Sequence, residues 1–179
     1  IALDTTTNAF TGAVTITTND DSGTDADVTI DGGTTAFILA ASTIDGDLTV
    51  RNGNSITDNG TVTVGGNLAA TTDDNNGVIN LGTLAVDGTV ALTTNGSGNA
   101  TLVNTAGLNF EASTVRGNLA ATATTGNMTD SGALTVARTT TLTTSANTAT
   151  IAPDTTTNAF TGALTNPTKH DSRTNPDVN

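Results

Sequence analysis

The sequence has no cysteine, tryptophan or tyrosine, and only four phenylalanines and one methionine in 179 residues. The absence of cysteine excludes a disulfide scaffold, a zinc module, an iron–sulfur protein and a covalent haem carrier. Basic residues are also scarce: 5 Lys and Arg stand against 17 Asp and Glu, so the formal net charge is -12. Because nucleic-acid binders need a basic face and often aromatic platforms, we expect no nucleic-acid partner. No apolar run approaches the roughly 20 residues of a membrane span, so we expect no membrane insertion.

Threonine, asparagine and glycine are abundant instead, with 44, 20 and 19 residues, which is nearly half of the chain. Such a composition is also typical of disordered segments. However, 35% of the residues are hydrophobic, and they are regularly spaced rather than scattered. The spacing favours a folded chain.

The sequence repeats itself on two scales. The segment IALDTTTNAFTGAV (1–14) returns as IAPDTTTNAFTGAL (151–164), an offset of 150 with two substitutions. Within that period, STIDGDL (42–48) returns as STVRGNL (113–119), an offset of 71. TDNGTVTV (57–64) returns as TDSGALTV (129–136), an offset of 72. Fixed periods of this kind are the signature of repeat architectures.

A shorter unit underlies both repeats, with the pattern apolar-x-Gly-x-apolar-x-apolar. It begins at Phe10, Ile44, Val64, Val86, Val115, Val136 and Phe160, and the sixth unit lacks the glycine. The offsets between successive starts are 34, 20, 22, 29, 21 and 24. These offsets predict solenoid turns of roughly 20–24 residues, with two turns lengthened by insertions.

Apolar residues alternate within each unit, which is the period of a half-buried strand. Val14-Ile16, Leu48-Val50, Val62-Val64, Val90-Leu92 and Leu134-Val136 should point inward, and turn formers such as DGG and DNG separate the strands. No window has helical spacing. The sequence therefore predicts an all-β, right-handed parallel β-helix of about six to seven coils, roughly 30 Å long at ~4.8 Å per strand. The rival fold, a string of antiparallel sandwiches, needs a longer repeat and usually a central aromatic residue.

The units resemble those of large exported bacterial adhesins related to filamentous haemagglutinin and of β-strand-repeat surface proteins. The resemblance is carried by GNLAATATTGNMTDSGALTV (117–136) and its partial copy GDLTVRNGNSITDNGTVTV (46–64). It implies secretion, a long extracellular shaft, and adhesion or biofilm roles located elsewhere in the parent protein. The sequence lacks the export signal and secretion domain of that family and starts in mid-pattern at Ile1, so we expect a piece of a longer protein. We divide it into a β-helix region, 1–164, and a non-repeating tail or linker, 165–179.

No catalytic constellation is evident, and we expect no enzyme. The only histidine, His170, lies in the tail beside Lys169, Asp171, Ser172 and Arg173, and neighbours on a loop do not make a catalytic triad. An alternative is a carbohydrate-active β-helix enzyme, which would carry paired carboxylates, or Asp with Arg or Lys, on adjacent coils. We expect that the single Glu111 and the arginines Arg51, Arg116 and Arg138 do not coincide with an Asp cluster at matching coil positions.

Asp20, Asp21, Asp25 and Asp27 form the strongest candidate metal site. This oxygen-rich, glycine-interrupted loop could hold calcium, which takes six to eight oxygen ligands. Asp73 and Asp74 with Asn75 form a weaker copy. Neither matches an EF-hand loop or the repeat of calcium β-rolls, and acidic loops without metal are common. We expect no other cofactor.

Threonine rows raise a further alternative, an ice-binding module, although no Thr-x-Thr pair is kept in every coil. The favoured interpretation is a structural segment of an extracellular bacterial adhesin or surface filament. Its expected partners are its own repeats or identical subunits, joined through end-to-end strand pairing, and its receptor cannot be identified from the residues.

Overall fold

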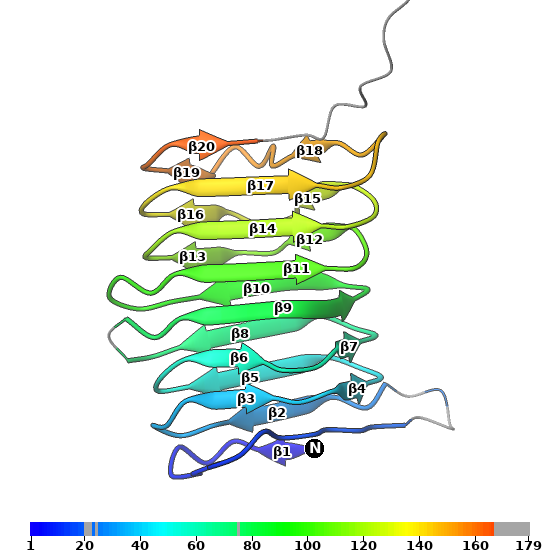
Figure 1. Cartoon of the computed structure of the whole chain (residues 1–179), viewed down its shortest axis with the longest axis vertical. Coiled ribbons are helices and arrows are strands. Elements are labelled where there is room, and N and C mark those ends of the chain that lie inside the picture. Colours follow the sequence, from blue (N-terminus) through cyan, green and yellow to red (C-terminus); the bar gives the residue numbers. More distant parts are fainter. Residues whose placement is uncertain (20–22, 24, 75, 167–179) are drawn as a thin grey trace, which may run out of the picture.

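The computed structural model describes residues 1–19, 23, 25–74 and 76–166. They form a β-solenoid of about seven turns, and these residues contain no helix. In Figure 1 the chain climbs from β1 to β20, with the nearer strands running left to right and the farther strands right to left. This path is right-handed, as expected for parallel crossover connections. The predicted fold class is confirmed.

Two parallel sheets make up the solenoid. The first sheet contains β1 (Ala2–Leu3), β2 (Val28–Asp31), β5 (Leu48–Asn52), β8 (Leu68–Thr72), β10 (Thr89–Thr93), β12 (Leu108–Phe110), β13 (Ser113–Val115), β15 (Met128–Asp130), β16 (Leu134–Val136), β18 (Ile151–Ala152) and β19 (Ala159–Phe160). The second sheet contains β3 (Phe37–Leu39), β4 (Ser42–Ile44), β6 (Ile56–Asp58), β7 (Val62–Val64), β9 (Ile79–Val86), β11 (Ala100–Asn104), β14 (Leu119–Ala123), β17 (Thr140–Thr144) and β20 (Leu164–Thr165).

The core lies between the two sheets and is one contiguous apolar cluster. Alternate strand residues enter it as the sequence pattern predicts: Leu48 and Val50 are buried, whereas Thr49 between them is exposed. Strand pairing places each inward residue on its counterpart one coil away. One such column in the second sheet runs through Phe37, Ile56, Ile79, Ala100, Leu119, Thr140 and Leu164. Stacking of this kind buries what a single coil could not bury alone.

The shorter sequence repeat, with its offset of 71 to 72, corresponds to three and a half turns. β5 lies in the first sheet, and its sequence copy, β14, lies in the second. The copies of β3, β4, β6 and β7, which lie in the second sheet, are β12, β13, β15 and β16 in the first. The solenoid therefore presents similar local structures on opposite sides. The longer repeat, from Ile1 to Ile151, corresponds to seven turns, so β1 and β18 lie in the same sheet.

Two of the offsets between units have a different cause from the one predicted. The unit at Phe10 leads to Val14, which pairs with the second sheet at Leu39, whereas the unit at Ile44 leads back to the first sheet. The offsets of 34 and 29 thus cover one and a half turns each, and the prediction of two turns lengthened by insertions at these places is wrong. Most paired residues, such as Leu48 and Leu68, are separated by one coil of the predicted length. The longest separation between paired strand residues is that between Ala2 and Thr29.

Thr140 occupies a core position with an unpaired hydroxyl group. Its side chain is fully buried in the column between Leu119 and Leu164, and its Oγ1 has no hydrogen-bond partner. A buried hydroxyl without a partner is unfavourable by roughly 1–3 kcal/mol.

We therefore predict that Thr140→Val stabilises the protein, since valine has nearly the same shape and no hydroxyl to desolvate. The expected gain is about 1 kcal/mol, which corresponds to a rise of roughly 2–4 °C in melting temperature for a chain of this size. Thr141→Val, at the neighbouring outward-facing position, is the control and should change the melting temperature little. A lower melting temperature for Thr140→Val in thermal denaturation would contradict the prediction.

Candidate functional site

Polar side chains at the entrance to successive strands form ladders along the solenoid. Asp27 Oδ1 accepts the amide N–H of Asp47 at 2.9 Å, and Asp47 Oδ1 accepts that of Asn67 at 2.7 Å. Asn67 Oδ1 then accepts the amide of Thr89 at 2.8 Å. Each side chain thus satisfies a backbone donor one coil further on, which fixes the register between coils.

The second copy of the repeat builds the same ladder on the opposite side. Asn99 Oδ1 accepts the amide of Asn118 at 2.8 Å, and Asn118 Oδ1 accepts that of Thr139 at 3.1 Å. In most coils a glycine stands before the receiving residue and leaves room for the incoming oxygen. A Cβ atom on Gly66 would lie 2.2 Å from Asp47 Oδ1, and one on Gly117 would lie 2.3 Å from Asn99 Oδ1. The repeated Gly-Asp/Asn-apolar pattern was the sequence signal for this ladder, which sequence analysis had not identified.

A second device recurs in the TDNG and TDSG motifs. The carboxylate of Asp58 accepts the amides of Gly82 at 2.9 Å and Thr83 at 2.8 Å in the next coil. Its copy, Asp130, accepts the amide of Asp154 at 2.9 Å and also binds the Asn158 side chain. Both carboxylates therefore hold backbone of the following coil outside its regular pairing: Asp58 binds the irregular part of β9, and Asp130 binds the segment after β18.

The predicted calcium cluster is only partly described. Asp20 and Asp21 lie outside the described residues. Asp25 is exposed, and Asp27 is exposed with one carboxylate oxygen bound to the ladder amide of Asp47. Among the residues that the structure describes, no group of three or more His, Cys, Asp or Glu side chains could hold a metal ion.

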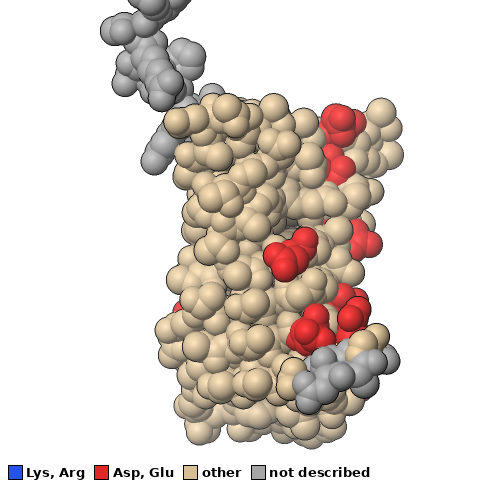
Figure 2. Space-filling view, turned by 90° about the vertical axis from the view of Figure 1, so that its right-hand side faces the viewer, with Lys and Arg blue, Asp and Glu red and all other residues tan. Residues whose placement is uncertain are grey.

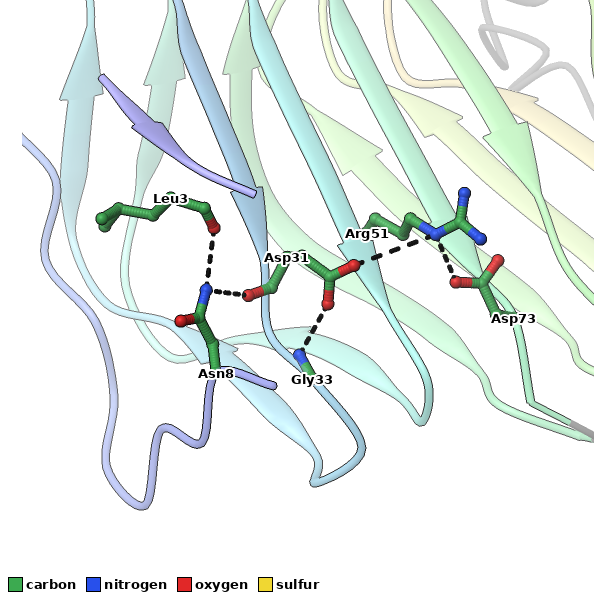
Figure 3. Close-up of polar contacts among 6 residues, drawn as sticks. All are labelled: Leu3, Asn8, Asp31, Gly33, Arg51 and Asp73. Atoms are coloured by element: carbon green, nitrogen blue, oxygen red, sulfur yellow. Dashed lines mark hydrogen bonds and ion pairs between the residues drawn. The ribbon is translucent and has the colours of Figure 1, made fainter. Parts of the chain in front are cut away.

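Arg51 does coincide with acidic residues, contrary to the sequence-based expectation. Its Nε lies 2.6 Å from Asp73 Oδ2 and 3.9 Å from Asp31 Oδ2, on three successive coils (Figure 3). The sequence concealed this cluster because each of the three residues lies on a different coil. Asp31 is buried, its Oδ1 accepts the amide of Gly33 at 2.8 Å, and its backbone oxygen accepts Asn8 Nδ2 at 2.9 Å. These contacts give the cluster a structural role in holding the first coil.

The tail that contains the other catalytic candidates lies mostly outside the described residues, including Lys169, His170, Asp171, Ser172 and Arg173. Its sequence, however, continues the longer repeat: 165–179 matches 15–29 at seven of 15 positions, among them the Asp-Ser pair and the Asp-Val pair. The expectation of a non-repeating tail is therefore wrong at the level of sequence.

Outward-facing threonines stack over part of the solenoid: Thr71, Thr93, Thr114 and Thr135 form one column in the first sheet. Neighbouring columns are interrupted. In the first sheet Thr29 stacks on Thr49, but Ala69 follows in the next coil. In the second sheet Ala120 separates Thr101 from Thr141. Threonine columns are therefore confined to part of the solenoid, and ice binding stays an untested alternative.

The side of the solenoid on which β4 and β7 lie is acidic. Figure 2 shows acidic side chains at several heights on this side and no lysine or arginine among them. Like charges on facing surfaces repel, so this side disfavours lateral packing of copies against one another. No helix long and apolar enough to cross a membrane occurs among the described residues.

The two ends of the solenoid carry its exposed large apolar residues. Among the described residues these are Ile1 at 56%, Leu3 at 46% and Leu164 at 48% exposure. Ile1 and Leu3 belong to the first coil (residues 1–18), and Leu164 belongs to the last coil (151–166). The ends also leave strand edges unpaired within the described residues. Exposed apolar residues beside open strand edges mark interaction surfaces.

Comparison with known families identifies the repeat. A family model described as "Repeats of unknown function (DUF5649)" matches residues 25–74 and 97–166. The second match begins at an offset of 72 from the first, which is the offset of the shorter sequence repeat. No curated protein and no solved structure shows a significant match.

We predict that Asn118→Ala destabilises the protein by about 1 kcal/mol, because the amide and hydroxyl of Thr139 lose their acceptor. Asn118→Asp is the matched control, since Asp47 already fills the equivalent place in the other ladder and a carboxylate keeps the acceptor. Urea denaturation measures both variants. Equal stability of the alanine variant and the parent protein would show that the ladder contributes nothing.

The calcium hypothesis is tested by thermal denaturation with calcium and with a chelator. A bound ion would raise the melting temperature by mass action. Asp27→Asn should abolish that rise while keeping the acceptor for the Asp47 amide. If the melting temperature of the parent protein is the same in calcium and in chelator, the acidic loop is not a calcium site.

Proposed function

We propose that this chain, which belongs to the DUF5649 family of repeats of unknown function, is a structural segment of an extracellular bacterial adhesin or surface filament. In this role it forms part of a stiff rod that holds a binding end away from the cell surface. Its partners are its own repeats or identical subunits, which continue the rod end to end. The receptor is then bound elsewhere in the parent protein.

The observation that carries this proposal is the seven-turn period. The segments 1–14 and 151–164 differ only where Pro153 replaces Leu3 and Leu164 replaces Val14, and both segments begin in the first sheet. A whole number of turns lets each repeat unit start in the same orientation as the unit before it. Successive units can thus extend one straight solenoid without a hinge.

The physical properties of the coil support a mechanical role. The strands of both sheets pair in parallel from the first coil to the last, and the side-chain ladders reinforce them. Bending such a rod would strain many hydrogen bonds at once. The absence of cysteine and the high content of aspartate also suit a chain that is exported unfolded and folds outside the cell.

We predict that a chain carrying residues 1–150 twice, followed by 151–179, forms a single longer rod. The expected lengthening is about 34 Å, from seven strand spacings of ~4.8 Å, with an unchanged cross-section. Small-angle X-ray scattering and electron microscopy measure both quantities. Two separately moving bodies, or a bend at the junction, would contradict the proposal.

A further inference from the structure

One coil sequence occurs twice in the molecule and folds in the same way both times. In the first coil the amide of Asn8 donates to Thr5 O at 3.0 Å, and in the last coil Asn158 donates to Thr155 O at 3.0 Å. The side-chain Nδ2 of Asn8 donates to Leu3 O at 2.9 Å, and that of Asn158 donates to Pro153 O at 3.2 Å. The two coils are therefore structural copies at opposite ends of the solenoid.

Each copy shows the contacts that the other lacks. The first coil is bound on the side of β2: the Ile1 ammonium group donates to Asp27 O at 2.7 Å, and the Phe10 ring packs edge-on against Phe37 with centroids 5.5 Å apart. The last coil is bound on the other side, by the penultimate coil (128–150). There Asn158 Oδ1 accepts the amide of Leu134 at 2.7 Å.

The outer edge of the first coil, which faces away from β2, has the groups that these contacts require. Its Asn8 Oδ1 is the counterpart of Asn158 Oδ1, and among the described residues it accepts no hydrogen bond. A Cβ atom on Gly12 would meet no atom within 4 Å, whereas one on the equivalent Gly162 would lie 2.5 Å from the carbonyl carbon of Arg138. The backbone of Arg138 occupies the space beside Gly162, and the equivalent space beside Gly12 is open.

We propose that the edge of the penultimate coil formed by β15, β16 and β17 binds the first coil of a second copy of this chain, in place of the chain's own last coil. This inference rests on the proposed rod function and specifies how two copies join. Ala2 would lie on Thr129, as Ala152 does now, and Asn8 would accept the Leu134 amide. The contact is head-to-tail and does not close, so it generates filaments.

Replacement is favoured over stacking on the last coil because the last coil is a poor platform. Ile1 donates to and accepts from the coil that contains β2. Because N–H groups two residues apart in a strand point the same way, the Leu3 N–H also points toward β2. The corresponding Pro153 has no N–H to offer, and proline at an edge blocks strand pairing. The buried Ile16 of the first coil is matched by the exposed Asn166.

The replacement also needs no newly ordered coil. It breaks the interface between the penultimate and last coils and forms an interface of the same register with the second copy. The incoming first coil is already folded against β2 of its own copy, so little conformational entropy is lost on binding. Exchange of an identical element between protomers is a low-cost route to assembly.

Glycine substitutions test the joint in the full chain by sedimentation velocity over a range of concentrations. We expect the parent protein to form concentration-dependent linear oligomers. Gly12→Ala should weaken association at least tenfold, because its methyl group would meet Arg138 of the copy to which the first coil binds, while the melting temperature stays unchanged. Gly82→Ala adds a methyl group at an open position, 3.9 Å from the nearest atom, Asp58 Oδ1, and should associate like the parent protein.

Disulfide trapping identifies which edges meet, and the chain has no cysteine of its own. A mixture of Thr129→Cys and Ala2→Cys chains should form a mixed disulfide. The double variant Thr129→Cys/Ala152→Cys locks the last coil within one chain when it is oxidised, and it should stay monomeric until it is reduced. Adjacent parallel strands bring such pairs within disulfide range.

Two outcomes would overturn the inference. A disulfide between Ala2→Cys and Ala152→Cys chains, without one between Ala2→Cys and Thr129→Cys, would show stacking on the last coil and leave the rod function intact. A parent protein that remains monomeric at all concentrations, together with cysteine variants that form neither disulfide, would exclude the joint. The rod function fails separately, if the duplicated chain does not form one straight rod.

Discussion

The parallel hydrogen-bond ladder between coils is the constraint on which the rest of the molecule depends. It sets neighbouring backbones ~4.8 Å apart, so every residue is stacked on a counterpart in the next coil. At that spacing a corner that receives a side-chain oxygen from the coil before has little room for a Cβ atom, and glycine precedes the receiving residue at every such corner but the one at Arg138. Positions 66 and 117 carry glycine for this reason, since Asp47 Oδ1 and Asn99 Oδ1 occupy the space that a Cβ atom would need. Asp58 and Asp130 join neighbouring coils where the ladder is interrupted, by accepting the amides of Gly82 and Asp154, which take no part in the strand register.

Much of this arrangement could be predicted from local sequence, because the coil is built from short-range rules. Alternation placed Leu48, Val50, Leu134 and Val136 inside, and all four are buried. Side-chain contacts between coils could not be predicted in the same way. Arg51, Asp31 and Asp73 are distant in sequence, and only the strand register brings them together. The calcium cluster remains a prediction, because Asp20 and Asp21 lie outside the described residues.

That the shorter repeat spans three and a half turns, not a whole number, could not be predicted from the sequence for a different reason. A corner motif looks the same in sequence whether it leads from the first sheet to the second or back again. Only pairing shows that the unit at Phe10 and the unit at Ile44 turn on opposite sides. Ser42 and Ser113 illustrate the consequence: each hydroxyl accepts a backbone amide of the preceding coil at 3.0 Å, from Ile16 and Leu92, but the two serines lie in different sheets. One short repeat thus serves both sides of the solenoid.

A solenoid satisfies its backbone everywhere except at its ends, where the edge strands keep unpaired donors and acceptors. In this chain two near-identical copies of one coil sequence form the two ends. Where the coil carries Leu3 and Ile16, it has a full set of strand amides and a buried side chain for the coil above it. Where it carries Pro153 and Asn166, one amide is missing and the apolar residue is lost. Two substitutions therefore convert a coil that supports continued growth into one that opposes it, and the difference between the ends gives the rod a direction.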